Sequence, residues 1–196
     1  MLFATMPLAA MTLAEVRRKW NRRHAGRLEE ESAPQPNPLA MRFANRVHGG
    51  TLLDAACGFG AGTAALLGRV DRVIGVDLSD TALAAARRHF GDDPRLNWIQ
   101  GDVSQLPWKA NYFSAVCAFG FTDWVFLRRA PELLRPGGIF MYQGFSRRQL
   151  TLKPTLAPDW TSTPESISAL FPGWEKLACE ESGEAPYRVS FAARRP

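Results

Sequence analysis

Cysteine and histidine are scarce in this chain of 196 residues, with three of each. The three cysteines, Cys57, Cys117 and Cys179, are too few and too far apart for a disulfide framework or a zinc-ligand pattern. We expect them to be reduced packing residues. The histidines are also dispersed, and only His24 lies near a segment that we expect to touch a site. The sequence therefore predicts no metal site and no obligate catalytic base.

Long apolar runs are absent too, so no segment matches a membrane span. Residues 1–11 are apolar but lack a basic n-region and a cleavage site, and we expect a cytoplasmic protein rather than a secreted one. The net charge is +5, and its densest cluster, residues 17–23, lies on one predicted helix. Such a cluster favours a solvated helix face over a nucleic-acid arm. We expect a small-molecule substrate, no nucleic-acid or membrane partner, and a monomer or homodimer.

Apolar strand patterns alternate with helical patterns along most of the chain. The predicted strands are 51–56, 72–77, 96–100, 113–119, 139–145, 174–181 and 187–194. The predicted helices follow Thr12, Asn37, the turn near residue 60, Ser79, residue 123 and Thr163, the second of them reaching residues 49–50. Alternation of this kind indicates βαβ units. We predict a single Rossmann-like α/β domain, with a mostly parallel seven-stranded sheet, helices on both faces and a C-terminal antiparallel hairpin. Residues 146–163 are predicted to be a long loop.

The segment 51–63 carries the strongest functional signal. An apolar strand ends in Asp54, and a turn with Gly58 and Gly60 leads into a helix of small residues. Glycines let the backbone approach a ligand, and the helix start presents free N–H groups. A dinucleotide fingerprint needs glycine where Thr63 stands, and a P-loop needs a lysine that the segment lacks. Because Asp54 would repel a pyrophosphate, the segment favours a nucleotide-like ligand with an ammonium group and no phosphate.

Two further acids end the next predicted strands. Asp77 stands where an acid commonly accepts hydrogen bonds from ribose hydroxyls, and Asp102 can accept one from an adenine amino group. Three carboxylates, a glycine turn and no basic phosphate clamp describe S-adenosylmethionine as the cofactor.

These segments resemble the class I S-adenosylmethionine-dependent methyltransferases. The resemblance covers residues 53–60, 75–79, 101–107 and 134–138, in the order and spacing of that family. It implies that residues 54–60 hold the methionine part, that Asp77 holds the ribose, and that the residues after Asp77 and Asp102 line the adenine. Ala56 and Ser114 depart from the pattern, because the family usually has glycine and aspartate there. Without a carboxylate at position 114, we expect no catalytic base from that position. The residues expected to bind the cofactor are Trp20, Asp54, Ala56, Cys57, Gly58, Gly60, Asp77, Leu78, Asp102, Val103 and Phe119.

The two ends of the chain resemble a smaller group, which includes the thiopurine and tellurite methyltransferases. The matching segments are 19–23, 36–39, 145–150 and 173–174. This resemblance implies a small acceptor that reacts as a soft nucleophile, such as a thiol or a chalcogen anion. It also implies that residues 1–49 form helices that can act as a lid, and that residues 50–196 form the cofactor-binding domain.

Aromatic residues are expected near the reacting methyl group. Phe119, Phe121 and Trp124 follow the fourth predicted strand, and the alternation of the two phenylalanines places one toward the ligand and one in the core. Leu13, Val16 and Trp20 are expected to share the apolar face of the first predicted helix. Trp20 is either part of a lid or a core residue of that helix. Two other functions remain open: a tRNA or rRNA methyltransferase, slightly favoured by the basic first helix, and a non-catalytic S-adenosylmethionine-binding protein.

Overall fold

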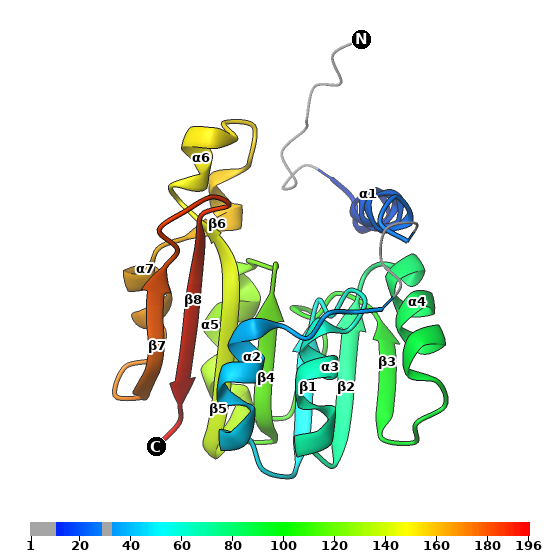
Figure 1. The fold of residues 1–196 in the computed structure, drawn as a ribbon, viewed down its shortest axis with the longest axis vertical. Helices are drawn as coiled ribbons and strands as arrows, with labels where there is room; N and C mark the ends of the chain where they lie inside the picture. The colour runs from blue at the N-terminus through cyan, green and yellow to red at the C-terminus, as the bar shows by residue number, and fades with distance from the viewer. Residues whose placement is uncertain (1–10, 29–32) are drawn as a thin grey trace.

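The computed structural model describes residues 11–28 and 33–196, shown as a ribbon in Figure 1. The apolar start of the chain lies outside the described residues up to residue 10. Seven strands form one continuous sheet in the order β3-β2-β1-β4-β5-β8-β7. They are β1 Thr51–Ala55, β2 Arg72–Asp77, β3 Leu96–Gln100, β4 Phe113–Phe119, β5 Leu134–Ser146, β7 Glu175–Glu181 and β8 Arg188–Arg194. Strands β1 to β5 pair in parallel, and β8 pairs antiparallel with both β5 and β7.

This topology confirms the predicted Rossmann-like fold and its C-terminal hairpin. The strand count differs slightly, because the two-residue strand β6, Thr161–Ser162, pairs with β5 at Phe145 and Ser146. The segment 146–163 is therefore not a plain loop. It also contains helix α6, Gln149–Leu152, and a 3₁₀ turn at Pro158–Trp160.

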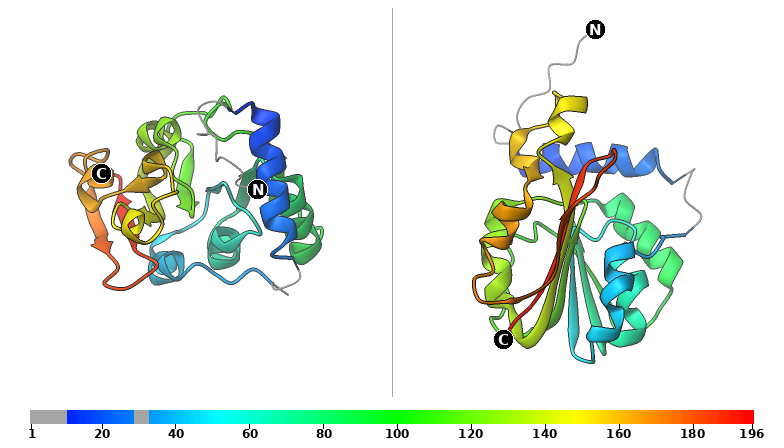
Figure 2. Two further views of the ribbon diagram at one scale, coloured as in Figure 1. Left: turned by 90° about the horizontal axis from the view of Figure 1, so that it is seen from above. Right: turned by 60° about the vertical axis from the view of Figure 1, so that its left-hand side comes forward.

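Helices cover both faces of the sheet (Figure 2). Helices α2 Pro38–Phe43, α3 Ala61–Leu66 and α4 Asp80–Phe90 lie on one face, and α5 Trp124–Leu133 and α7 Pro164–Ser168 lie on the other. Leu52 and Leu66 belong to the core of the first face, and Phe126 and Phe140 to the core of the second. Helix α1, Leu13–Ala25, lies across the carboxyl ends of the first strands, beside α4 (Figure 1).

Local signals set most helix starts. Thr12 and Glu15 form a capping box on α1, Asn37 caps α2 ahead of Pro38, and Ser79 caps α4. The predicted end of the second helix was wrong. Helix α2 stops at Phe43, a 3₁₀ turn follows to Arg46, and the backbone is extended at the buried residue Val47. Burial of Val47 against the sheet therefore ends the helix before the glycines at 49 and 50.

Candidate cofactor and active site

The predicted glycine turn lies at the carboxyl end of β1. Gly58 and Gly60 have φ angles of 54° and 94°, and Gly60 caps α3. These angles fall in the left-handed region, which glycine adopts readily. Ala56 also has a positive φ, 50°, which is costly for a residue with a side chain. The turn is therefore held in a strained shape that keeps its backbone close to the sheet edge.

Asp54 lies beneath this turn and is almost completely buried, with 2% of its surface exposed. Its Oδ2 accepts hydrogen bonds from the backbone N–H of Thr63 at 2.7 Å and from the Thr63 hydroxyl at 2.8 Å. Burial raises the pKa of this carboxyl to about 7, against the lowering effect of those hydrogen bonds. Asp54 therefore caps the first turn of α3, as an aspartate in such a turn can. Its role in binding a ligand stays a prediction.

Gly62 is a site residue that sequence reasoning missed. A Cβ on Gly62 would lie 2.7 Å from Asp54 Oδ1, so only glycine leaves room for that carboxylate against the start of α3. The run of small residues after Gly60 was the available signal, because a helix packed onto a buried acid needs small side chains.

Asp77 lies at the end of β2 and bridges the turn and α4. Its Oδ2 accepts a hydrogen bond from Gly58 N–H at 2.9 Å, and its Oδ1 accepts one from Ser79 N–H at 2.8 Å. Burial raises the pKa of Asp77, while the hydrogen bonds from Ser79 and Gly58 act in the opposite direction. Leu78 follows it and is half-buried.

Asp102 and Val103 follow β3, next to Asp77. The Gly101 N–H donates to the Asp77 carbonyl at 3.0 Å, which brings the two strand ends together. Asp102 Oδ1 accepts hydrogen bonds from the N–H and hydroxyl of Ser104 at 2.9 and 2.8 Å. The three predicted carboxylates therefore do gather along one edge, on three neighbouring strands.

Cys57 packs under the turn rather than facing solvent. Its N–H donates to the Val76 carbonyl at 2.9 Å, and its sulfur lies 3.3 Å from where a Cβ on Gly75 would be. Burial is the main cause that raises the pKa of the Cys57 thiol. The side chain is thus a small buried packing group, as expected for a reduced cysteine.

Helix α1 covers the glycine turn. The His24 ring lies 5.3 Å from the Phe59 ring and 5.9 Å from that of Trp20, and a Cβ on Gly58 would lie 3.9 Å from His24 Nε2. His24 is buried, and its charge lowers the pKa of Asp77. The buried face of α1 contains Val16, Trp20 and His24.

The structure therefore corrects the apolar face expected for this helix. Leu13 was expected to share a face with Val16 and Trp20, but it is 56% exposed. His24 takes part instead and was missed. The signal that could have found it is the spacing of four residues from Val16 to Trp20 to His24, which places all three on one face of a helix.

Two contacts hold α1 in place. Arg17 donates from Nε and Nη2 to the two carboxylate oxygens of Asp80, at 3.3 and 3.1 Å, and Asn21 donates to the same carboxylate. At its other side, the Lys19 ammonium lies 4.6 Å from the centre of the Trp160 ring. The helix thus bridges the start of α4 and the segment that follows β5.

The aromatic residues after β4 divide between the two faces of the sheet. Phe119 packs against the core that includes α2 and α3, whereas Phe121 packs against the opposite core, with its ring 6.1 Å from that of Phe126. Trp124 donates from its indole N–H to the Asp159 carbonyl at 3.1 Å. Both phenylalanines are half-buried, so which one meets a ligand stays a prediction.

Ser114 lies at the other end of the sheet. It is buried at the start of β4, and its hydroxyl donates to the Thr51 carbonyl at 3.1 Å. The amino end of β4 is far from the carboxyl edge that carries the three aspartates. The identity of residue 114 therefore does not bear on the choice of a base, contrary to the expectation from sequence.

Comparisons with known proteins agree with this geometry. The family described as "Methyltransferase domain" matches residues 53–142. A 2-phytyl-1,4-naphtoquinone methyltransferase from Thermosynechococcus vestitus is 33% identical over 57% of this chain and 53% of its own length. A demethylmenaquinone methyltransferase from Clavibacter sepedonicus is 35% identical over 51% of this chain and 43% of its own. The chain thus spans about half the length of these curated relatives.

A solved structure shows the same fold over nearly the whole chain. Phosphoethanolamine N-methyltransferase 2 of Haemonchus contortus, in complex with S-adenosyl-L-methionine, superposes with a TM-score of 0.71 and 16% identity, covering 97% of this chain and 61% of that one. The fold is that of the class I S-adenosylmethionine-dependent methyltransferases. The comparisons bear out the predicted methyltransferase class and its cofactor, but the relatives are named for quinones and not for thiopurine or tellurite.

Within the described part of this methyltransferase fold, no cluster of three or more potential metal ligands occurs. No helix in the same part is long and apolar enough to cross a membrane.

Proposed function

We propose that this chain transfers a methyl group from S-adenosylmethionine to a small-molecule acceptor. The observation that carries the proposal is the gathering of Asp54, Asp77 and Asp102 around the glycine turn, at the carboxyl edge where ligands of this fold class bind. The cofactor's ammonium, ribose hydroxyls and adenine amino group are all donors, so its polar groups match three acceptors. When bound, the cofactor supplies a methyl group already activated on a sulfonium ion.

The side chains around the turn have capacity left for such a ligand. Each oxygen of Asp77 accepts a hydrogen bond from a backbone N–H, and a carboxylate oxygen can accept two. The ribose hydroxyls can therefore add to the bonds from Gly58 and Ser79 without displacing them. Helix α1 over the turn would exclude water from the ligand, which strengthens electrostatic interactions within the site.

The acceptor side supports an aromatic or a soft nucleophile. Phe121, Trp124 and Trp160 are half-buried beyond the ends of β4 and β5, and Lys19 approaches the last of them. Such a wall suits an apolar ring. We infer two acceptor chemistries: a thiol or chalcogen anion, from the resemblance of the chain ends to the thiopurine and tellurite group, and a quinol ring, from the names of the relatives. Both ionise without help at moderately alkaline pH, which fits a site with no obligate base.

The test is a transfer assay with methyl-labelled cofactor. The acceptors are a reduced naphthoquinone, an aryl thiol, selenite, tellurite and bulk RNA. We expect label on one of the small acceptors, with the signal lost in Asp77→Asn and kept in Asp92→Ala, whose carboxylate is exposed beyond α4. Label on RNA alone would favour an RNA methyltransferase. Cofactor binding with no transfer to any acceptor would favour a non-catalytic binding protein.

A further inference from the structure

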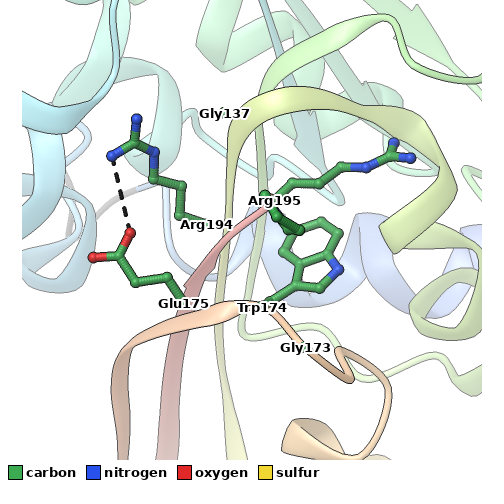
Figure 3. Close-up of a pocket in the computed structure, with 7 residues that line it drawn as sticks. Gly137, Gly173, Trp174, Glu175, Arg194 and Arg195 are labelled. Carbon is green, nitrogen blue, oxygen red and sulfur yellow. Dashed lines mark ion pairs between the residues drawn. The ribbon is translucent and has the colours of Figure 1, made fainter.

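The amino edge of the sheet, opposite the cofactor edge, carries two adjoining cavities that share Gly137 and Arg194. The smaller, of about 250 Å³, is lined by Arg46, Arg135 and Arg194 together with His48 and Ser114. We name it the arginine hollow. The larger, of about 510 Å³, continues past Glu175 to Trp174 (Figure 3).

We propose that the arginine hollow binds the phosphate group of an anionic ligand. Three guanidinium groups line it, and Glu175 supplies a carboxylate that pairs with two of them. Glu175 is shared between two of the arginines, at 3.6 Å from Arg46 Nη1 and 3.9 Å from Arg194 Nη1 (Figure 3 shows the second pair). Both distances are too long for good hydrogen bonds. A single carboxylate at these distances offsets at most one of the three positive charges of the hollow.

Arg135 is already oriented for an anion. Its Nη2 donates to the His48 carbonyl at 3.0 Å, which fixes the plane of the guanidinium. Its Nη1 faces a space that a side chain on Gly50 would fill, since a Cβ there would lie 3.1 Å from Nη1 and 3.0 Å from Ser114 Oγ. Gly50 has a φ of 72°, which favours glycine, and its N–H already donates to Asp71 Oδ2 at 2.6 Å. The bare backbone therefore leaves the exposed Arg135 guanidinium uncovered on this side, with the buried Ser114 hydroxyl beneath it.

A phosphate group fits this arrangement better than a carboxylate. Guanidinium groups pair in a forked geometry with phosphate oxygens, and three of them around one hollow match a tetrahedral group with two charges. The adjoining larger cavity has room for the rest of the ligand, beside the half-buried indole of Trp174. Arg195 lines that cavity too, but its guanidinium donates to the Leu134 carbonyl and to Asn111.

This site lies at the amino ends of β1, β4 and β5, so it is separate from the proposed cofactor site. An experiment can therefore refute the phosphate site without refuting the proposed function, and the reverse. The experiment is thermal unfolding of the full chain in phosphate-free buffer, with inorganic phosphate added and with sodium chloride at matched ionic strength. We expect phosphate to raise the melting temperature above the chloride control. Arg135→Ala should weaken the apparent affinity at least about tenfold, as expected for loss of a charge-assisted hydrogen bond. Ser114→Asp, which adds a negative charge beside Arg135, should abolish it.

Two controls keep the result interpretable. Arg128→Ala removes an exposed arginine on α5, on another part of the surface, and should respond to phosphate as the unaltered protein does. Arg46→Ala is a second variant, for use if Arg135→Ala does not fold, because within the described residues the Arg46 side chain pairs with Glu175 and donates to no backbone carbonyl. An equal rise in chloride, or a phosphate response in both Arg46→Ala and Arg135→Ala that equals that of the unaltered protein, overturns the proposal.

Two further binding experiments distinguish a lipid headgroup from a soluble phosphate ester as the source of the phosphate group. Sedimentation with phosphatidylglycerol vesicles, but not with phosphatidylcholine vesicles, and its loss in Arg135→Ala would assign a lipid headgroup. Binding of inorganic phosphate and adenosine monophosphate that is lost in Arg135→Ala, without vesicle binding, would assign a soluble phosphate ester. Vesicle binding that Arg135→Ala and Arg46→Ala both leave unchanged, with no phosphate-specific stabilisation, contradicts the proposal.

Discussion

Replacing Asp54 by asparagine tests the most unusual charge in the site. The carboxyl is buried beneath the glycine turn, and burial raises its pKa from 3.8 to about 7. In the unfolded chain the same group ionises near its ordinary pKa. Between about pH 4 and pH 7, the folded protein therefore keeps a proton on Asp54 that the unfolded chain has already released. The stability contributed by protonated Asp54 is complete below pH 4 and is lost as the pH rises through 7.

The size of the effect follows from that interval. A difference of one pH unit between two pKa values corresponds to about 1.4 kcal/mol, so ionised Asp54 costs the fold about 4 kcal/mol at most above pH 7. Asparagine carries no charge and can still accept hydrogen bonds from Thr63 through its amide oxygen. Neutral hydrogen bonds are weaker than those of a carboxylate by about 1 kcal/mol each. We therefore expect Asp54→Asn to be about 1–3 kcal/mol more stable than the unaltered protein at pH 8.

The assay is urea unfolding of both proteins from pH 4 to pH 8. The difference in the free energy of unfolding should grow across that range, and other ionisable groups cancel in the difference. Binding of S-adenosylmethionine should weaken in the same variant, because its ammonium loses a charged partner. A stability difference that stays constant from pH 4 to pH 8 would refute the reasoning, since Asp54 would then be ionised throughout.

Three further outcomes follow from the same edge of the sheet. Asp77→Asn should lower the affinity for S-adenosylmethionine about 10- to 100-fold in calorimetry with the fold retained, whereas an unchanged dissociation constant would remove Asp77 from the site. Ala56→Gly should stabilise the protein by about 0.5–1 kcal/mol in urea unfolding. The left-handed backbone costs alanine about 1–2 kcal/mol, and glycine avoids this cost but loses more conformational entropy on folding, which offsets part of the gain. Asp80→Ala should release Arg17 and α1, speeding cofactor association a few-fold in stopped-flow fluorescence and lowering turnover, and equal rates would mean that the helix does not gate the site.

Much of the sheet could be predicted because its signals are local. Strands β2, β3 and β4 have the bounds that their apolar runs predict, and α4 runs from its Ser79 cap to the residue before Gly91. The proximity of the three aspartates could be predicted from the sequence for a related reason. Once the strands are parallel, their carboxyl ends must meet at one edge, so residues at those ends become neighbours without further information.

The segment after β5 could not be read in the same way. Strand β6 has two residues and exists through its pairing with Phe145 and Ser146, while α6 has four residues and lacks a side-chain cap. Elements this short have almost no intrinsic stability, so tertiary contacts decide whether they form. Sequence patterns of charge and hydrophobicity do not record those contacts.

The position of α1 was suggested by the family resemblance and could not be derived from local patterns, for a different reason that also bears on its role. Its existence follows from a capping box, but its place over the glycine turn depends on pairing of Arg17 with Asp80, 63 residues away, and on the approach of Lys19 to Trp160. Exposed pairs of this kind contribute little stability, about 0–1 kcal/mol each, and leave no pattern in the sequence. The apolar anchorage of the helix is also small, with Val16 and His24 its buried residues. Weak anchorage of this kind is what a lid requires, because a helix held by few buried contacts can open and close over a ligand at low cost. The lid role of α1 therefore stays a prediction, which the Asp80→Ala variant tests.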